Sequence, residues 1–223
     1  MSDIIATDLV KQYGQGDLTV TALDNVGLRI ASGEFVAVMG QSGSGKSTLL
    51  SILGALNTPS SGTLTVDELD IYSLGQDQRA DFRREYLGFV FQSFHLLPYL
   101  NVLENVMIPL AVTSDSRRSK EERALAALAE VGLDKKVHRL PSEISGGEQE
   151  RVAIARAVVN NPPIILADEP TGNLDSKTGG EVMNLLGRLN AAGRTIVMVT
   201  HSAENARHAR RILHLADGRL QDG

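Results

Sequence analysis

Four short apolar runs, each ending at a polar residue, constrain the fold of this 223-residue chain most strongly. They span residues 35–39, 89–91, 164–167 and 196–200, and none alternates as a strand with one exposed face does. Such runs are typical of strands buried on both faces, as in a parallel sheet covered by helices. Ligands of open α/β sheets bind beyond the carboxyl ends of the strands. The sequence therefore predicts an α/β fold whose polar strand endings line one crevice.

The residues after the first run match the phosphate-binding loop pattern G-x-x-x-x-G-K-[ST]. The match is Gly40, Gln41, Ser42, Gly43, Ser44, Gly45, Lys46, Ser47 and Thr48. Glycines let successive backbone N–H groups point at an anion, and the following helix N-terminus adds partial positive charge. We expect Lys46 to reach the β- and γ-phosphates of a nucleotide and Ser47 to bind Mg²⁺. The alternative is a Gly/Ser-rich turn before a helix, without a ligand.

A second candidate anion site precedes the helical stretch 149–159. Ser145, Gly146, Gly147 and Glu148 form the pattern of a capping box, in which Ser145 caps the helix and Glu148 reaches back. That structural reading is the ordinary one for this pattern. Two glycines, however, weaken the start of a helix, so we expect them to let a phosphate approach the backbone.

These motifs, in this order along the chain, resemble those of the ATP-binding cassette (ABC) ATPases. The stretch 144–149 resembles the family's signature motif, and Asp168-Glu169 stands downstream as the family's order requires. The resemblance covers essentially the whole chain. It implies adenine stacking by Tyr13, a Q-loop at Gln92, a D-loop ending at Asp175 and a switch histidine at His201. Glu148 departs from the family's usual Gln, which leaves the helix cap possible but removes an amide donor.

The resemblance also implies a hydrolytic mechanism with ATP and Mg²⁺. Asp168 would hold Mg²⁺, together with Ser47 and Gln92, and Glu169 would be the general base that activates the attacking water. His201 would contact the γ-phosphate and keep that water and Glu169 aligned. The competing interpretations are a strand-end turn for Asp168, a structural carboxylate for Glu169, a solvated His201 and a surface aromatic for Tyr13.

The chain has one phosphate-binding loop and one signature motif, and in the family that it resembles the two halves of a complete ATP site come from different subunits. By resemblance, two copies should pack head-to-tail, with Ser145, Gly146, Gly147 and Glu148 of each copy facing the loop of the other. Two-fold symmetry then makes two identical ATP sites, with Asp175 at the seam of the homodimer.

The predicted organisation is one ABC ATPase domain over residues 1–223. Its RecA-like core spans 1–93 and 141–223, and it includes an antiparallel β lobe with strands at 18–23, 26–30 and 62–66. Residues 94–140 form an inserted helical lobe with a helix at 120–131 and an exposed connection at 114–119. The last helix of that lobe starts after the signature motif at 145–148.

The composition of the chain argues against several classes of partner and site. The net charge is −5 and no basic tract stands out, which argues against nucleic acid. There is no cysteine, hence neither a disulfide nor a thiolate metal site, and no apolar run approaches the roughly 20 residues of a membrane span. Residues 1–3 do not resemble the start of a secretory leader.

The resemblance extends to a group of ABC ATPases through residues 169–175. They are similar to those of the macrolide-exporter, lipoprotein-release (LolD-like) and FtsE group. We therefore expect a separate transmembrane permease as partner, bound at the cytoplasmic face of the inner membrane near residues 94–100. The function implied is powering export, lipoprotein release or mechanotransmission. The alternatives are an FtsE-like regulator of cell-wall enzymes and a soluble, non-transport ABC ATPase.

Overall fold

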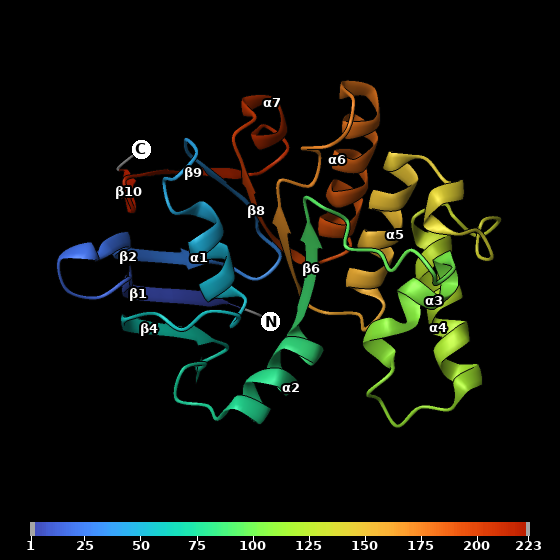
Figure 1. Ribbon diagram of the computed structural model, residues 1–223, viewed down its shortest axis with the longest axis horizontal. Helices are drawn as coiled ribbons and strands as arrows, with labels where there is room; N and C mark the ends of the chain where they lie inside the picture. The colour runs from blue at the N-terminus through green and yellow to red at the C-terminus, as the bar shows by residue number, and fades with distance from the viewer. Residues whose placement is uncertain (1–2, 222–223) are drawn as a thin grey trace.

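The computed structural model describes residues 3–221, so residues 1–2 and 222–223 of the predicted domain lie outside the described residues. Its larger sheet has the strand order β10-β9-β3-β8-β7-β6 (Figure 1). The four predicted runs are its parallel strands β3 (Phe35–Met39), β8 (Thr195–Thr200), β7 (Ile164–Asp168) and β6 (Leu87–Phe91). β9 (Arg211–Ala216) is parallel to β3, and β10 (Arg219–Gln221) is antiparallel to β9. The predicted parallel-sheet α/β fold is confirmed.

Both faces of the four strands β3, β8, β7 and β6 are largely buried, which explains the absence of alternation in the four runs. On β3, Phe35 and Ala37 belong to a core shared with α5 (Gly146–Val158) and α6 (Ser176–Ala191). Val36 and Val38 point the other way, into a core shared with α1 (Lys46–Leu53). Each strand therefore joins two apolar layers.

The predicted antiparallel β lobe is present as a second sheet, although its strands differ from those expected. The order is β2-β1-β4-β5, formed by β2 (Val20–Ile30), β1 (Ile4–Tyr13), β4 (Ser61–Val66) and β5 (Leu69–Asp70). The two strands expected at 18–23 and 26–30 form the single strand β2. The polar residues between them stay within β2, at the point where its pairing with β1 shifts register. A 3-10 turn, η1 (Gly16–Leu18), joins β1 to β2.

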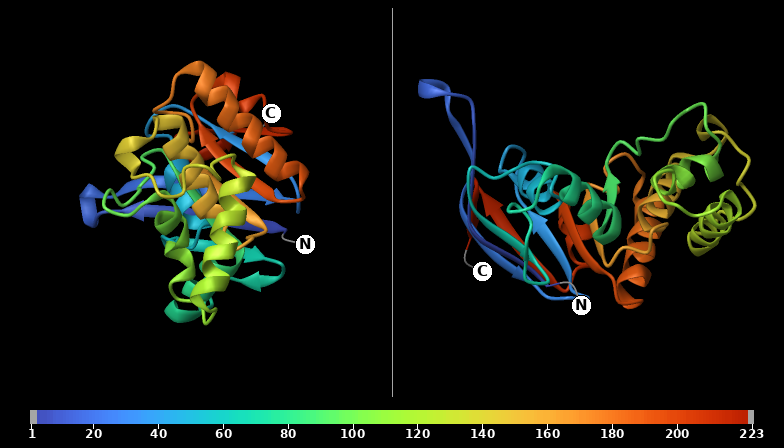
Figure 2. Two further views of the ribbon diagram at one scale, coloured as in Figure 1. Left: turned by 90° about the vertical axis from the view of Figure 1, so that its right-hand side faces the viewer. Right: turned by 90° about the horizontal axis from the view of Figure 1, so that it is seen from below.

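The helices of the middle section lie at the opposite end of the molecule from the β1–β2 hairpin (Figures 1 and 2). The expected helix at 120–131 is α4 (Arg117–Glu130). It starts earlier because Ser116 caps it by accepting from the N–H of Ser119, which shortens the exposed connection predicted at 114–119. The remaining helical segments are α2 (Gln76–Tyr86), α3 (Val102–Met107), η2 (Ile108–Leu110), η3 (Pro141–Glu143) and α7 (Ala203–Ala206).

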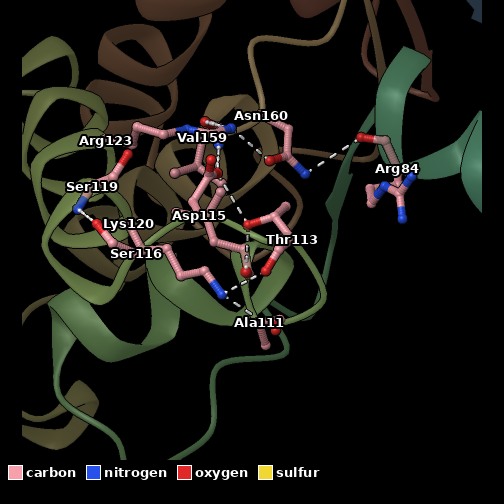
Figure 3. A network of polar contacts seen from close by, with 11 residues as sticks. Arg84, Ala111, Thr113, Asp115, Ser116, Ser119, Lys120, Arg123, Val159 and Asn160 are labelled. Atoms are coloured by element: carbon pink, nitrogen blue, oxygen red, sulfur yellow. Dashed lines mark hydrogen bonds and ion pairs between the residues drawn. The ribbon is translucent and has the colours of Figure 1, made fainter.

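A polar network ties α4 to the rest of the chain (Figure 3). Arg123 donates to Asp115 at 2.7 Å and to the side-chain oxygen of Asn160 at 2.8 Å. Asn160, just after α5, in turn donates to the backbone oxygen of Arg84 in α2 at 3.3 Å. These contacts connect the middle helices to the segment that leads into β6. Among residues 3–221, no helix has the length and apolar character required to cross a bilayer.

Candidate active site

A cavity of about 710 Å³ lies at the carboxyl ends of the parallel strands. The structure brings the polar endings of all four predicted runs to it, because those strands are parallel neighbours. Its lining residues are Ala22, Gln41, Ser42, Gly43, Gly45, Lys46, Ser47, Thr48, Gln92, Asp168, Glu169 and His201. This volume is in the range of small-molecule sites in proteins.

The conformation of the loop between β3 and α1 is fixed by contacts within the loop and with a neighbouring strand. Gly45 caps α1 with φ of 100°, a conformation that favours glycine, and a Cβ there would collide with the backbone oxygen of Ala22. Lys46 is buried and donates from Nζ to the backbone oxygens of Gly40 and Gln41, both at 2.8 Å. A lysine ammonium has three donors, so these two bonds leave one for a ligand.

Two of the residues that line this cavity contact each other through a hydroxyl and a carboxylate. Ser47 Oγ donates to Asp168 Oδ1 at 3.4 Å, across 121 positions of sequence. Burial, and to a lesser degree the Glu169 carboxylate, raise the pKa of Asp168, while Ser47 and Lys46 oppose the shift. A buried carboxylate beside another acid is stabilised by a cation. Oxygen donors of this kind suit Mg²⁺, so these residues fit the expected metal.

Glu169 is fixed by two neighbours at the end of β8. Its Oε2 accepts from the hydroxyl of the buried Thr200 at 3.1 Å, and its Oε1 lies 2.8 Å from His201 Nδ1. The Glu169 side chain is 14% exposed, whereas His201 is 70% exposed. Glu169 also has φ of 47°, a strained conformation for a residue with a side chain. Thr200 was not predicted to be a site residue, because in the sequence it is only the last residue of an apolar strand.

Gln92 lies beside the segment that ends in Asp175. Asn173 Nδ2 donates to the backbone oxygen of Gln92 at 2.8 Å. Asp175 is the N-cap of α6, where its two carboxylate oxygens accept from the N–H and the hydroxyl of Thr178 at 3.0 and 2.6 Å. These bonds, the hydroxyl first, lower the pKa of Asp175.

The signature motif forms the predicted capping box at the start of α5. Ser145 Oγ accepts from the N–H of Glu148 at 3.3 Å, and Glu148 Oε2 accepts from the N–H of Ser145 at 2.9 Å. Within the described residues, the set that lines the 710 Å³ cavity includes none of residues 145–148. The two candidate anion sites of one chain are therefore separate.

The two signature glycines differ in their surroundings. Gly147 is buried, and a Cβ there would collide with Thr178 Cγ2 of α6. Gly146 is exposed, with only an ordinary contact to Leu174. The expectation that both glycines leave room for a phosphate stays a prediction, and Gly147 in addition permits close packing of α5 on α6.

Tyr13 lies at the end of β1 and is 43% exposed. Its hydroxyl accepts from Asn57 Nδ2 at 2.6 Å, and Lys11 Nζ lies 5.0 Å from the ring centroid. Among the described residues, Tyr13 is not one of those that line the cavity.

Comparison with known proteins gives a consistent result. Residues 23–172 match the family described as ABC transporter. The macrolide export ATP-binding/permease protein MacB of Escherichia coli is 50% identical over 210 residues, which are 94% of this chain and 32% of that protein. MacB of Burkholderia pseudomallei is 49% identical over 214 residues, 96% of this chain and 33% of that protein. The chain thus spans about a third of these relatives.

Two solved structures match over nearly the whole fold. One is described as the dimeric structure of MJ0796, a bacterial ABC transporter cassette, with 46% identity and a TM-score of 0.89. The match covers 98% of this chain and 97% of that one. The other is the same cassette in a dimeric post-hydrolysis state bound to ADP and Pi, with 45% identity, the same coverage and the same TM-score.

Proposed function

Because this chain belongs to the ABC transporter ATPase family, we propose that two copies close head-to-tail over two Mg-ATP molecules and hydrolyse them. The observation that carries the proposal is the separation of the phosphate-binding loop from the exposed start of α5 within one chain. Each is a half-site for phosphate. A two-fold axis is the simplest way to bring both halves together.

The nucleotide-binding roles follow from the contacts. Backbone N–H groups of residues 40–48 and Lys46 would hold the phosphates, and Ser47, Asp168 and Gln92 would hold Mg²⁺. The metal would neutralise charge that develops on the phosphate oxygens. Adenine would stack on the face of Tyr13 opposite Lys11.

The residues that would carry out hydrolysis lie at the carboxyl ends of β7 and β8. Glu169 would accept a proton from the attacking water as general base. Thr200 and His201 hold its two carboxylate oxygens, so they would fix its direction before the water arrives. Gln92, bonded through its backbone to Asn173, would link the state of the nucleotide to the segment that ends at Asp175.

The missing half of the site would come from the second copy. Ser145 and Gly146 are exposed at the start of α5, where they would face the γ-phosphate held by the partner. Glu148 would keep that helix start capped. Asp175 is exposed and is bonded to Thr178, whose side chain lies against Gly147 of the signature motif. Asp175 would therefore lie at the seam.

Cross-linking between copies tests this arrangement, because the chain contains no cysteine of its own. We expect the double variant Ser42→Cys/Ser142→Cys, in a Glu169→Gln background, to form covalent dimers with a short bis-maleimide only when Mg-ATP is present. Ser42 lies on the phosphate-binding loop and Ser142 just before the signature motif, and both are exposed. Gel electrophoresis measures the dimer. The single variants are the controls, and equal yields from single and double variants would contradict a head-to-tail seam.

An apolar groove offers a docking surface for a permease. It has a volume of about 510 Å³ and lies between β6 and the middle helices, lined by residues including Leu56, Phe91, His95, Ile108 and Val112. Leu56 and Val112 are 54% and 72% exposed, respectively. Exposed apolar side chains around a groove typically mark a protein interaction site. A helix of a transmembrane permease, fused to the cassette or on a separate chain, would fit it.

Leu56→Glu should therefore weaken association with the permease without changing the cassette's own ATPase rate. A buried charge in an apolar contact costs several kcal/mol, so we expect a loss of about 10-fold or more in permease binding. Copurification from membranes and ATPase assays of the isolated cassette measure the two properties. Leu125→Glu, at an exposed apolar position of α4 that is not among the groove's lining residues, is the matched control. A similar loss of permease binding in both variants would contradict the groove as the docking surface.

The name of the E. coli relative joins macrolide export with a permease. We propose the same class of work here: an ATPase at the cytoplasmic face of the inner membrane that drives a permease of the export type. The permease, and not the cassette, would select the substrate.

A further inference from the structure

Lys136 makes an ion pair with the signature motif that the sequence pattern did not indicate. It lies between α4 and η3, and its Nζ is 2.5 Å from Glu148 Oε1. The second oxygen of the same carboxylate, Oε2, accepts from the N–H of Ser145 at 2.9 Å and from its hydroxyl at 3.1 Å. Glu148 is thus bound on one side by Lys136 and on the other by Ser145.

This arrangement places a carboxylate where a phosphate is expected. Lys136, first, and the backbone of Ser145 lower the pKa of Glu148, so the carboxylate is ionised at neutral pH. A negative charge suits a helix N-terminus, but it repels a second anion brought to the same place. It also competes for the Ser145 hydroxyl, whose single proton is now donated to Glu148.

We propose that Lys136 is a positioning residue for ATP-driven dimerisation: it neutralises Glu148 so that the start of α5 accepts the γ-phosphate held by a second copy. This inference rests on the proposed head-to-tail function. Lys136 does not contact the 710 Å³ cavity of its own chain and acts through Glu148. It is 43% exposed, so its removal leaves no buried gap.

The proposal is tested in a Glu169→Gln background, where size-exclusion chromatography over a range of Mg-ATP concentrations measures dimerisation. A charge at a helix end changes affinity by about 2- to 5-fold, and two symmetric sites give about 4- to 25-fold overall. Because each dimer takes up two ATP molecules, we expect Lys136→Ala to raise the half-saturating ATP concentration by the per-site factor of about 2- to 5-fold, and added salt to reduce the difference by screening. Lys136→Arg should behave like the parent. Lys135→Ala removes the same charge one residue away, at an exposed position outside the ion pairs of the described chain, and is the matched control.

The decisive variant is Lys136→Ala/Glu148→Gln, which removes both charges. We expect it to recover most of the affinity lost in Lys136→Ala, because an uncharged Gln no longer repels the phosphate. If the double variant is as weak as Lys136→Ala, or if Lys136→Ala equals the parent, the proposal is wrong. A parent that stays monomeric at every ATP concentration would instead refute the head-to-tail function itself, and the role of Lys136 with it.

Discussion

Glu169→Gln should lower the steady-state ATPase rate by about 10²- to 10⁴-fold while Mg-ATP still binds. The amide has the shape of the carboxylate but accepts no proton from water. The bond from Thr200 can persist because the amide keeps one oxygen, so the side chain should stay in place. Phosphate release measures the rate, and equilibrium binding of a fluorescent ATP analogue measures affinity.

The same variant should accumulate as a dimer, because hydrolysis would remove the γ-phosphate that the proposed dimer holds between its copies. Size-exclusion chromatography with and without Mg-ATP measures this. Glu204→Gln is the control, since it changes a nearby exposed carboxylate in α7. A rate within a few-fold of the parent would exclude Glu169 as the base, and a monomer at all ATP concentrations would count against the closed dimer.

Much of the core fold was predictable because burial leaves a local pattern. The runs that became β3, β6, β7 and β8 are continuous and apolar, since each strand is covered on both faces. β1 and β9 were missed for the opposite reason. They carry mostly exposed or half-exposed side chains, and each pairs with a strand distant in sequence, β1 with β4 and β9 with β3.

The candidate site was predictable in its composition and less so in its contacts. Phosphate-binding residues and the acid pair stand together in sequence, so their motifs are visible. Thr200, Thr178 and Lys136 act on residues 31, 31 and 12 positions away, respectively, and no local spacing reveals such partners. Gly147 is an example of two demands on one residue. Its sequence context indicated a ligand, whereas its neighbour Thr178 gives it a packing role as well.

Lys46→Ala should raise the dissociation constant for Mg-ATP by about 10- to 10²-fold, since the one hydrogen bond that its charged ammonium has left for a ligand is worth roughly 1.5–3 kcal/mol. The ammonium is the buried cation of the cavity and faces a ligand with several negative charges. Its removal also leaves the carbonyls of Gly40 and Gln41 without their shared donor. The loop should therefore lose part of its fixed shape as well as its charge. Isothermal titration calorimetry measures the affinity.

Loss of structure and loss of binding can be separated with a matched lysine. Lys120 Nζ likewise donates to two backbone carbonyls, those of Ala111 and Thr113, but on α4 and away from the cavity (Figure 3). Lys120→Ala should cost up to about 1 kcal/mol of unfolding free energy and leave ATP affinity unchanged. Lys46→Ala should cost a similar amount of stability, measured by urea unfolding, yet lose nearly all binding at micromolar ATP. Affinity within about 3-fold of the parent in folded Lys46→Ala would mean that the loop backbone alone binds the phosphates, and Lys46 would then be only a brace for the loop.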